Sequence, residues 1–182
     1  MFLAAFIYPV YKQRAFFFEM TPCQASRSMY WYLTPFCESL EIARYIKTHT
    51  SKDDRIAVLG SEPQIYFYAD RISATGYIYT YGLMESHPFA LRMQQEMIKE
   101  IEAAQPKYLI FVKLPKSWMI RPDSERLIFN WFEKYQQKYF DLTGIIDIIS
   151  SDKTIYRWES EVRDYSPQST NVIYVFRRKV NT

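Results

Sequence analysis

The sequence is poor in the residues that build common catalytic sites. Its 182 residues include four glycines, two cysteines and two histidines. Few glycines leave few loops able to wrap a phosphate, and neither the three-glycine dinucleotide motif nor a Gly-Lys-Ser/Thr sequence occurs. Cys23 and Cys37 are separated by 14 positions and both lie apart from His49 and His87, which is not the spacing of a zinc site. We therefore expect no nucleotide cofactor and no metal.

The chain also lacks a large excess of charge of either sign. The chain has 23 basic and 20 acidic residues, which gives a net charge of +3, and the two signs are interspersed. The one basic run, at residues 177–179, is typical of the exposed end of a strand. Nucleic acid is therefore not an expected partner. The serine-nucleophile elbow Gly-x-Ser-x-Gly is absent as well, so the sequence predicts no catalytic residue.

Aromatic side chains, in contrast, are abundant: 16 tyrosines, 13 phenylalanines and four tryptophans. Residues 2–11 are apolar, but this run is about half as long as a membrane helix. The aromatic residues 16–18 follow two basic residues, a mixture typical of membrane interfaces. Two interpretations stay open, a core element or a segment beside a membrane span. We expect residues 1–33 to form a membrane-proximal segment and residues 34–182 to form one α/β domain.

The two cysteines also leave two states open. Cys23 and Cys37 could form a disulfide in an oxidising compartment, or they could remain two unpaired thiols. The sequence alone does not choose between them.

From residue 34 onward, helical and extended patterns alternate. A helix opens at Thr34-Pro35, because threonine is a good N-cap and proline suits the first helical position. Ser61 and Gln64 match a capping box ahead of a short helix. The predicted helices cover about residues 36–47, 63–69, 88–104 and 124–139, and the predicted strands cover 56–59, 72–80, 108–112, 142–149, 154–158 and 172–178.

The connections between these elements predict the sheet. Helix-length crossovers join the first strands, which favours parallel pairing, whereas the last three strands follow one another without a helix. We therefore expect a three-layer α/β/α sandwich with a mostly parallel, Rossmann-like sheet and antiparallel C-terminal edge strands.

Candidate binding residues lie where ligands collect in such sheets, beyond the carboxyl ends of the strands. Three loops meet this criterion, at residues 60–64, 80–87 and 113–122. Trp118 offers a flat face to a sugar ring, and Arg121 offers a bidentate donor to a phosphate or carboxylate. The alternative is that Ser61 and Gln64 only cap a helix while Trp118 packs on the sheet. The candidate binding residues are Ser61, Glu62, Gln64, Tyr81, Trp118 and Arg121.

The stretch Leu59–Tyr68, followed by Ser73–Tyr81, resembles one group of proteins. These are bacterial membrane glycosyltransferases of the dolichyl-phosphate-mannose protein mannosyltransferase type, and the similar part is the soluble domain after their last membrane helix. Further matches at Pro35-Phe36, Gln94–Glu96 and Ser117-Trp118 extend the resemblance over about residues 30–150.

In that family, the membrane-embedded part binds a polyprenyl-phosphate sugar and carries an acidic catalytic base. The resemblance therefore implies a non-catalytic periplasmic or exterior domain at the bacterial inner membrane, which assists acceptor positioning or stability. Its partners would be the membrane-embedded part of the same polypeptide and a glycan or protein acceptor. Cys37 stands where the family pattern has proline, so the resemblance does not imply a structural disulfide. The alternative is a free-standing small α/β enzyme or a sugar- or phosphate-binding module.

Overall fold

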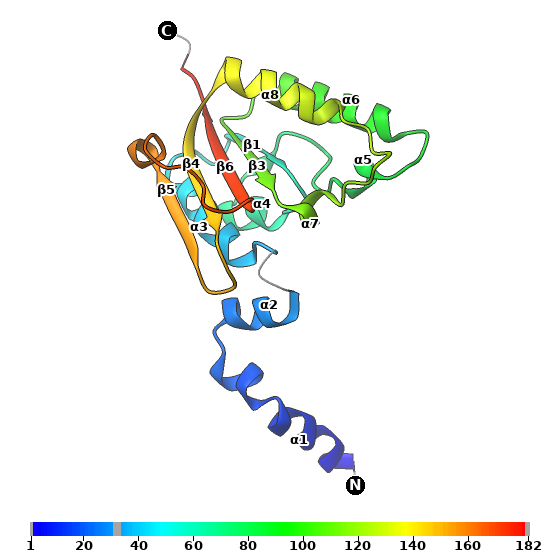
Figure 1. The fold of residues 1–182 in the computed structure, drawn as a ribbon, viewed down its shortest axis with the longest axis vertical. Helices are drawn as coiled ribbons and strands as arrows, with labels where there is room; N and C mark the ends of the chain where they lie inside the picture. The colour runs from blue at the N-terminus through cyan, green and yellow to red at the C-terminus, as the bar shows by residue number, and fades with distance from the viewer. Residues whose placement is uncertain (1, 31–33, 181–182) are drawn as a thin grey trace.

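One mixed sheet of six strands forms the centre of the molecule (Figure 1). The computed structural model describes residues 2–30 and 34–180, with side chains from residue 5 onward. The strands are β1 (Arg55–Leu59), β2 (Ile72–Ser73), β3 (Tyr108–Lys113), β4 (Phe140–Ile148), β5 (Thr154–Trp158) and β6 (Val172–Arg178). Their order is β2-β1-β3-β6-β4-β5. The pairings β2–β1 and β1–β3 are parallel, whereas β3–β6, β6–β4 and β4–β5 are antiparallel.

Helices lie on both faces of this sheet and also precede it in the chain. The helix predicted over residues 88–104 has an apolar stripe, on which Met97 and Ile101 are fully buried. The helices are α1 (Phe2–Lys12), the π-helix η1 (Ala15–Glu19), α2 (Pro22–Tyr30), α3 (Phe36–Thr48), α4 (Gln64–Ala69), α5 (Tyr81–Met84), α6 (Ala90–Ala104), α7 (Pro115–Trp118), α8 (Leu127–Tyr139) and the 3-10 turn η2 (Glu159–Val162).

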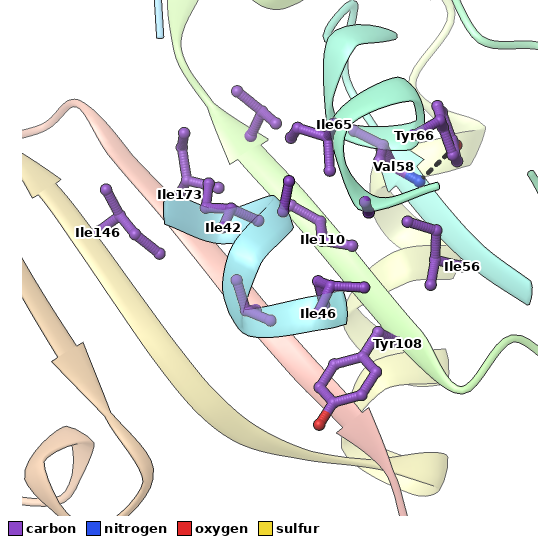
Figure 2. Close-up of a cluster of buried hydrophobic side chains, with 14 of the residues drawn as sticks. Ile42, Ile46, Ile56, Val58, Ile65, Tyr66, Tyr108, Ile110, Ile146 and Ile173 are labelled. Atoms are coloured by element: carbon purple, nitrogen blue, oxygen red, sulfur yellow. Dashed lines mark hydrogen bonds between the residues drawn. The ribbon is translucent and has the colours of Figure 1, made fainter. Parts of the chain in front are cut away.

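The first core cluster joins α3 and α4 to one face of the sheet (Figure 2). Ile42 and Ile46 of α3 pack over the strands, and Ile110 of β3 is among the fully buried residues beneath them. Tyr66 of α4 accepts a hydrogen bond at its hydroxyl from the backbone N–H of Val58, at 2.7 Å. That bond pairs a buried phenol with a strand amide, so α4 is fixed to β1 by a polar contact as well as by packing.

The second core cluster lies on the opposite face of the sheet. Successive strand residues point to opposite faces, so Leu109 and Phe111 face away from α3. They pack with Met97 of α6 and Phe132 of α8. The rings of Phe111 and Phe132 are stacked, with centroids 4.2 Å apart. This contact sets the position of α8 over β3.

The sheet is mixed and not, as predicted, mostly parallel. β6 pairs with β3 in the middle of the sheet instead of lying at an edge. Its residues Val172, Ile173, Val175 and Phe176 are buried. A strand that is apolar on both faces is stabilised by a central position, where both faces are covered.

The second strand is much shorter than the predicted span of residues 72–80. Pairing with β1 ends at Ser73. Beyond it, Glu100 of α6 accepts hydrogen bonds from the Thr75 hydroxyl at 2.6 Å and from the Gly76 amide at 2.9 Å. These bonds hold residues 75–76 against α6 and outside the sheet.

Three helix starts also differ from the prediction. Helix α3 begins at Phe36 with Pro35 as its N-cap and no side-chain capping bond, so the predicted N-cap at Thr34 is wrong. The short helix α4 has Pro63 as its N-cap and no side-chain capping bond, so the predicted capping box of Ser61 and Gln64 is wrong. Helix α8 begins at Leu127 and not at Asp123 or Ser124. Ser124 is instead buried and donates a short hydrogen bond to the carbonyl of Met84.

The N-terminal helices α1 and α2 extend away from the sheet at one end of the molecule (Figure 1). Phe6, Tyr8 and Phe18 are 70%, 62% and 76% exposed. No helix in the described ranges has the length and apolarity needed to cross a membrane. The expected boundary after residue 33 adjoins residues 31–33, which lie outside the described residues.

Helix α2 is joined to the domain by a disulfide, by polar contacts of Arg27 and by packing of the Tyr30 ring on Phe36 of α3. Of the two states left open for the cysteines, the structure has the disulfide between Cys23 and Cys37, with their Cα atoms 5.5 Å apart. Arg27 of α2 forms an ion pair with Glu38 of α3, which is fully buried. Thr154 also donates a hydrogen bond to Glu38, at 2.6 Å.

Candidate functional site

The three loops named from the sequence meet beyond the carboxyl ends of β1, β2 and β3. Ser61 follows β1, Thr80 follows β2, and Ser117 lies in α7 after β3. The Ser61 amide donates to the Ser117 hydroxyl at 2.9 Å, and the Ser61 and Thr80 hydroxyls are 3.0 Å apart. The Thr80 hydroxyl donates to the Ser117 carbonyl at 3.0 Å. All three residues are buried, so these bonds hold the strand ends together away from water.

Gly60 makes the close approach of these loops possible. Its φ of 150° is one that residues with a side chain rarely adopt. A Cβ atom there would lie 2.5 Å from the Ser117 Oγ and 2.8 Å from the Val112 Cβ. The local sequence therefore needs glycine directly after β1.

Glu62 is the titratable group of this cluster. It is 4% exposed and accepts a hydrogen bond from the Ser117 hydroxyl at 2.6 Å. Burial raises the pKa of the Glu62 carboxyl to about 7, although the hydrogen bonds from Ser117 and from the Ser61 backbone act in the opposite direction. Such a carboxyl can exchange a proton near neutral pH. Ser117, which bonds to this carboxyl, is 2% exposed, so a substrate cannot reach the Glu62–Ser117 pair.

Tyr81 lies at the outer side of the same cluster. It is 39% exposed, and its hydroxyl donates to the Lys116 carbonyl at 2.9 Å. Its pKa is raised by partial burial and by the nearby Glu62 charge. Tyr81 thus links α5 to α7 across the loops.

The remaining candidates lie in different surroundings. Trp118 is 2% exposed, donates its indole N–H to the Val112 carbonyl at 2.8 Å, and packs on Phe129 with ring centroids 4.6 Å apart. Its face is therefore occupied by protein. Arg121 is exposed and forms an ion pair with Glu85 at 3.5 Å.

Gln64 is directed to a different part of the molecule. Its side-chain amide donates to the hydroxyl of Ser39 in α3, at 3.0 Å. The structure thus brings Ser61, Glu62 and Tyr81 together, places Trp118 and Arg121 on the adjoining loop, and separates Gln64 from them. Thr80 and Ser117 belong to the cluster but were not among the candidates. Both lie within the loops named from the sequence, at residues 80–87 and 113–122.

A groove lies beside this cluster, between the α7 loop and α8. Its volume is about 650 Å³, and we call it the α7–α8 groove. Phe111 of β3 and Phe129 of α8 are half-buried, while Met119 and Ile120 are exposed. Its apolar wall is formed by Phe111, Leu114, Met119, Ile120, Phe129 and the edge of Trp118. The sequence indicated Trp118 but gave no signal that β3 and α8 would leave this space open.

Both histidines are engaged in local contacts. The His87 ring is 2.8 Å from the Gly82 carbonyl, and the His49 ring is 2.7 Å from the Tyr45 carbonyl. Within residues 2–30 and 34–180, no three His, Cys, Asp or Glu side chains form a group that could hold a metal ion.

Comparison of the chain with protein-family models, with curated proteins and with solved structures found no match in any of the three.

Proposed function

We propose that this chain is a non-catalytic extracytoplasmic domain of a polytopic membrane glycosyltransferase that uses a polyprenyl-phosphate sugar. In this proposal, the domain assists the positioning of the acceptor or the stability of the membrane part. The observation that carries the proposal is the N-terminal arrangement. Helices α1 and η1 carry exposed aromatic side chains and project from a compact domain (Figure 1). A disulfide links this domain to α2.

The exposed N-terminal surface has the composition of a membrane interface. Lys12 lies over the ring of Tyr8, 5.6 Å from its centroid, and Arg14 lies over Tyr11 at 5.5 Å. Aromatic rings beside basic side chains are typical of the headgroup region, where one end of each group is apolar and the other is hydrated. This supports a position next to a bilayer.

The disulfide between Cys23 and Cys37 supports a location outside the cytoplasm. Disulfides form and persist in oxidising compartments such as the periplasm and the cell exterior, and are rare in the cytoplasm. The proposed location is therefore the outer face of a bacterial inner membrane.

The fold and the strand-end cluster agree with a supporting role. We regard α3 and α4 on one face and α6 and α8 on the other as the outer layers of a three-layer, Rossmann-like sandwich. Glu62 and Ser117 at its strand ends are closed off by their neighbours. A domain of this kind can present a surface to an acceptor without performing chemistry.

The alternative function, a free-standing small α/β enzyme or binding module, is favoured by one observation. The buried Glu62 has a pKa raised to about 7, and carboxyls perturbed in this way are concentrated at functional sites.

The test is the state of the native polypeptide in its own cell. Antibodies against this domain are expected to detect an integral membrane protein of several hundred residues, with the domain accessible to protease from outside the inner membrane. A water-soluble product close to 21.9 kDa would contradict the proposal.

A transfer assay separates the two functions. The isolated chain is expected to transfer no sugar from any polyprenyl-phosphate donor. Turnover above a blank without enzyme would favour the alternative.

A further inference from the structure

The α7–α8 groove adjoins a second hollow that has partly the same lining. The second hollow has a volume of about 560 Å³ and shares Phe111, Lys113 and Phe129 with the first. It runs along α8 toward Leu142 of β4 and Phe176 of β6. Ligand pockets commonly have volumes of about 300–1,000 Å³, so the space suits a ligand. Its aromatic floor suits an apolar chain.

The charges along the α7–α8 groove have one sign. Lys113, Lys116 and Arg121 line it, and no carboxylate is found among the described residues of its lining. Arg121 also contacts Glu85 in an exposed ion pair, which a ligand anion can replace at small cost because such pairs contribute little. The acidic Glu133 lies in the second hollow, at the other end. Lys113 lines both hollows, so an anionic group is favoured where Lys113 is joined by Lys116 and Arg121, at the α7 end.

Polar recognition groups are otherwise few. Besides the three cations, Thr170 is the one side chain with a hydroxyl in the described lining of the α7–α8 groove. Recognition of a sugar or a nucleotide requires several placed donors and acceptors. The apolar floor with a cationic rim instead matches a molecule that has one anionic head and one apolar chain.

We propose that the α7–α8 groove is a binding site for a single-chain anionic amphiphile. The phosphate or carboxylate head lies at Lys113 and Arg121. The chain passes over Phe111 and Phe129 and enters the second hollow along α8. The inference does not depend on the function proposed above, because it uses only the shape, apolarity and charge of this surface.

The test uses the full chain and dodecyl phosphate, kept below the concentration at which it forms micelles. The methyl NMR signals of Met119 and Ile120 are expected to shift together and to saturate at one bound molecule. Butyl phosphate, which lacks the chain, and dodecanol, which lacks the charge, are each expected to bind at least about tenfold more weakly.

A pair of lysine substitutions tests the position of the head. Lys113 and Lys99 are both exposed, but Lys99 lies on α6, outside the α7–α8 groove. Lys113→Glu is expected to weaken dodecyl phosphate binding about tenfold or more, since it replaces an attractive charge with a repulsive one. Lys99→Glu is expected to change the affinity less than about twofold, because exposed charges at a distance are screened.

Three outcomes would overturn the proposal. The first is equal affinity of Lys113→Glu and Lys99→Glu. The second is a set of signal shifts confined to the exposed aromatic residues of α1, which would show nonspecific adsorption there. The third is binding to vesicles of anionic phospholipid without binding of the monomer, which would make the surface a membrane contact and not a site.

Discussion

Gly60 shows at the residue scale how one backbone position supports the strand-end cluster. Gly60→Ala is expected to lower the free energy of unfolding by about 2 kcal/mol or more, because the added Cβ meets Ser117 and Val112 at a φ of 150°. Urea denaturation measures the change. Gly76→Ala is the matched control, since its Cβ would meet nothing closer than 4.0 Å. Equal effects of the two substitutions would show that the packing around Gly60 is not the cause.

Glu62 belongs to the same scale and makes the stability dependent on pH. Its folded-state pKa of about 7 lies above the ordinary 4.5, so the folded protein retains a proton that the unfolded chain releases. The stabilisation that the neutral Glu62 carboxyl provides is therefore fully present below about pH 4.5, and it is lost as the pH rises through about 7. The expected fall in the free energy of unfolding is about 3 kcal/mol.

Urea denaturation at pH 5 and pH 8 tests this dependence. Glu62→Gln is expected to remove the fall, because an amide does not titrate. The exposed carboxyl of Glu133 provides a control, and Glu133→Gln is expected to behave as the unsubstituted protein does. A fall of the same size in Glu62→Gln would assign the effect to another group.

At the element scale, the ion pair between Arg27 and Glu38 contributes to the attachment of α2. Arg27→Ala is expected to cost about 3 kcal/mol of stability, because it leaves the fully buried Glu38 without its cation. Arg44→Ala, which breaks the exposed pair with Glu41 on α3, is expected to cost about 0.5 kcal/mol or less. Thermal unfolding compares the two. A small effect for both would mean that α2 is held by the disulfide and the Tyr30–Phe36 contact without help from Arg27.

Most elements could be predicted from the sequence, because local pattern and final environment agree. β5 and β6 have their predicted bounds, and the apolar stripe on α6 faces the core. The strand predicted to residue 80 failed because aromatic and β-branched residues favour a strand locally. Whether such a segment pairs with β1 depends on residues that are distant in sequence. Here Glu100 accepts hydrogen bonds from Thr75 and Gly76 and holds them outside the sheet.

For the whole molecule, residues 1–18 are expected to be separable from the rest of the chain. Removal of residues 1–18 is expected to leave a cooperative thermal transition and to reduce binding to detergent or lipid. The reason is that none of the residues 5–18 is buried, and Phe6, Tyr8 and Phe18 are largely exposed. Loss of the cooperative transition would show that this segment belongs to the core.

The sequence by itself determined the mixed α/β class, the periodic helices and the loops that gather at the strand ends. These features follow from short-range pattern and from the geometry of parallel strands. Only the tertiary structure decided the central position of β6, the burial of Glu62 and Trp118, and the opening between α7 and α8. Each of these depends on which surfaces meet across the sheet, and that is settled by the packing of residues far apart in the chain.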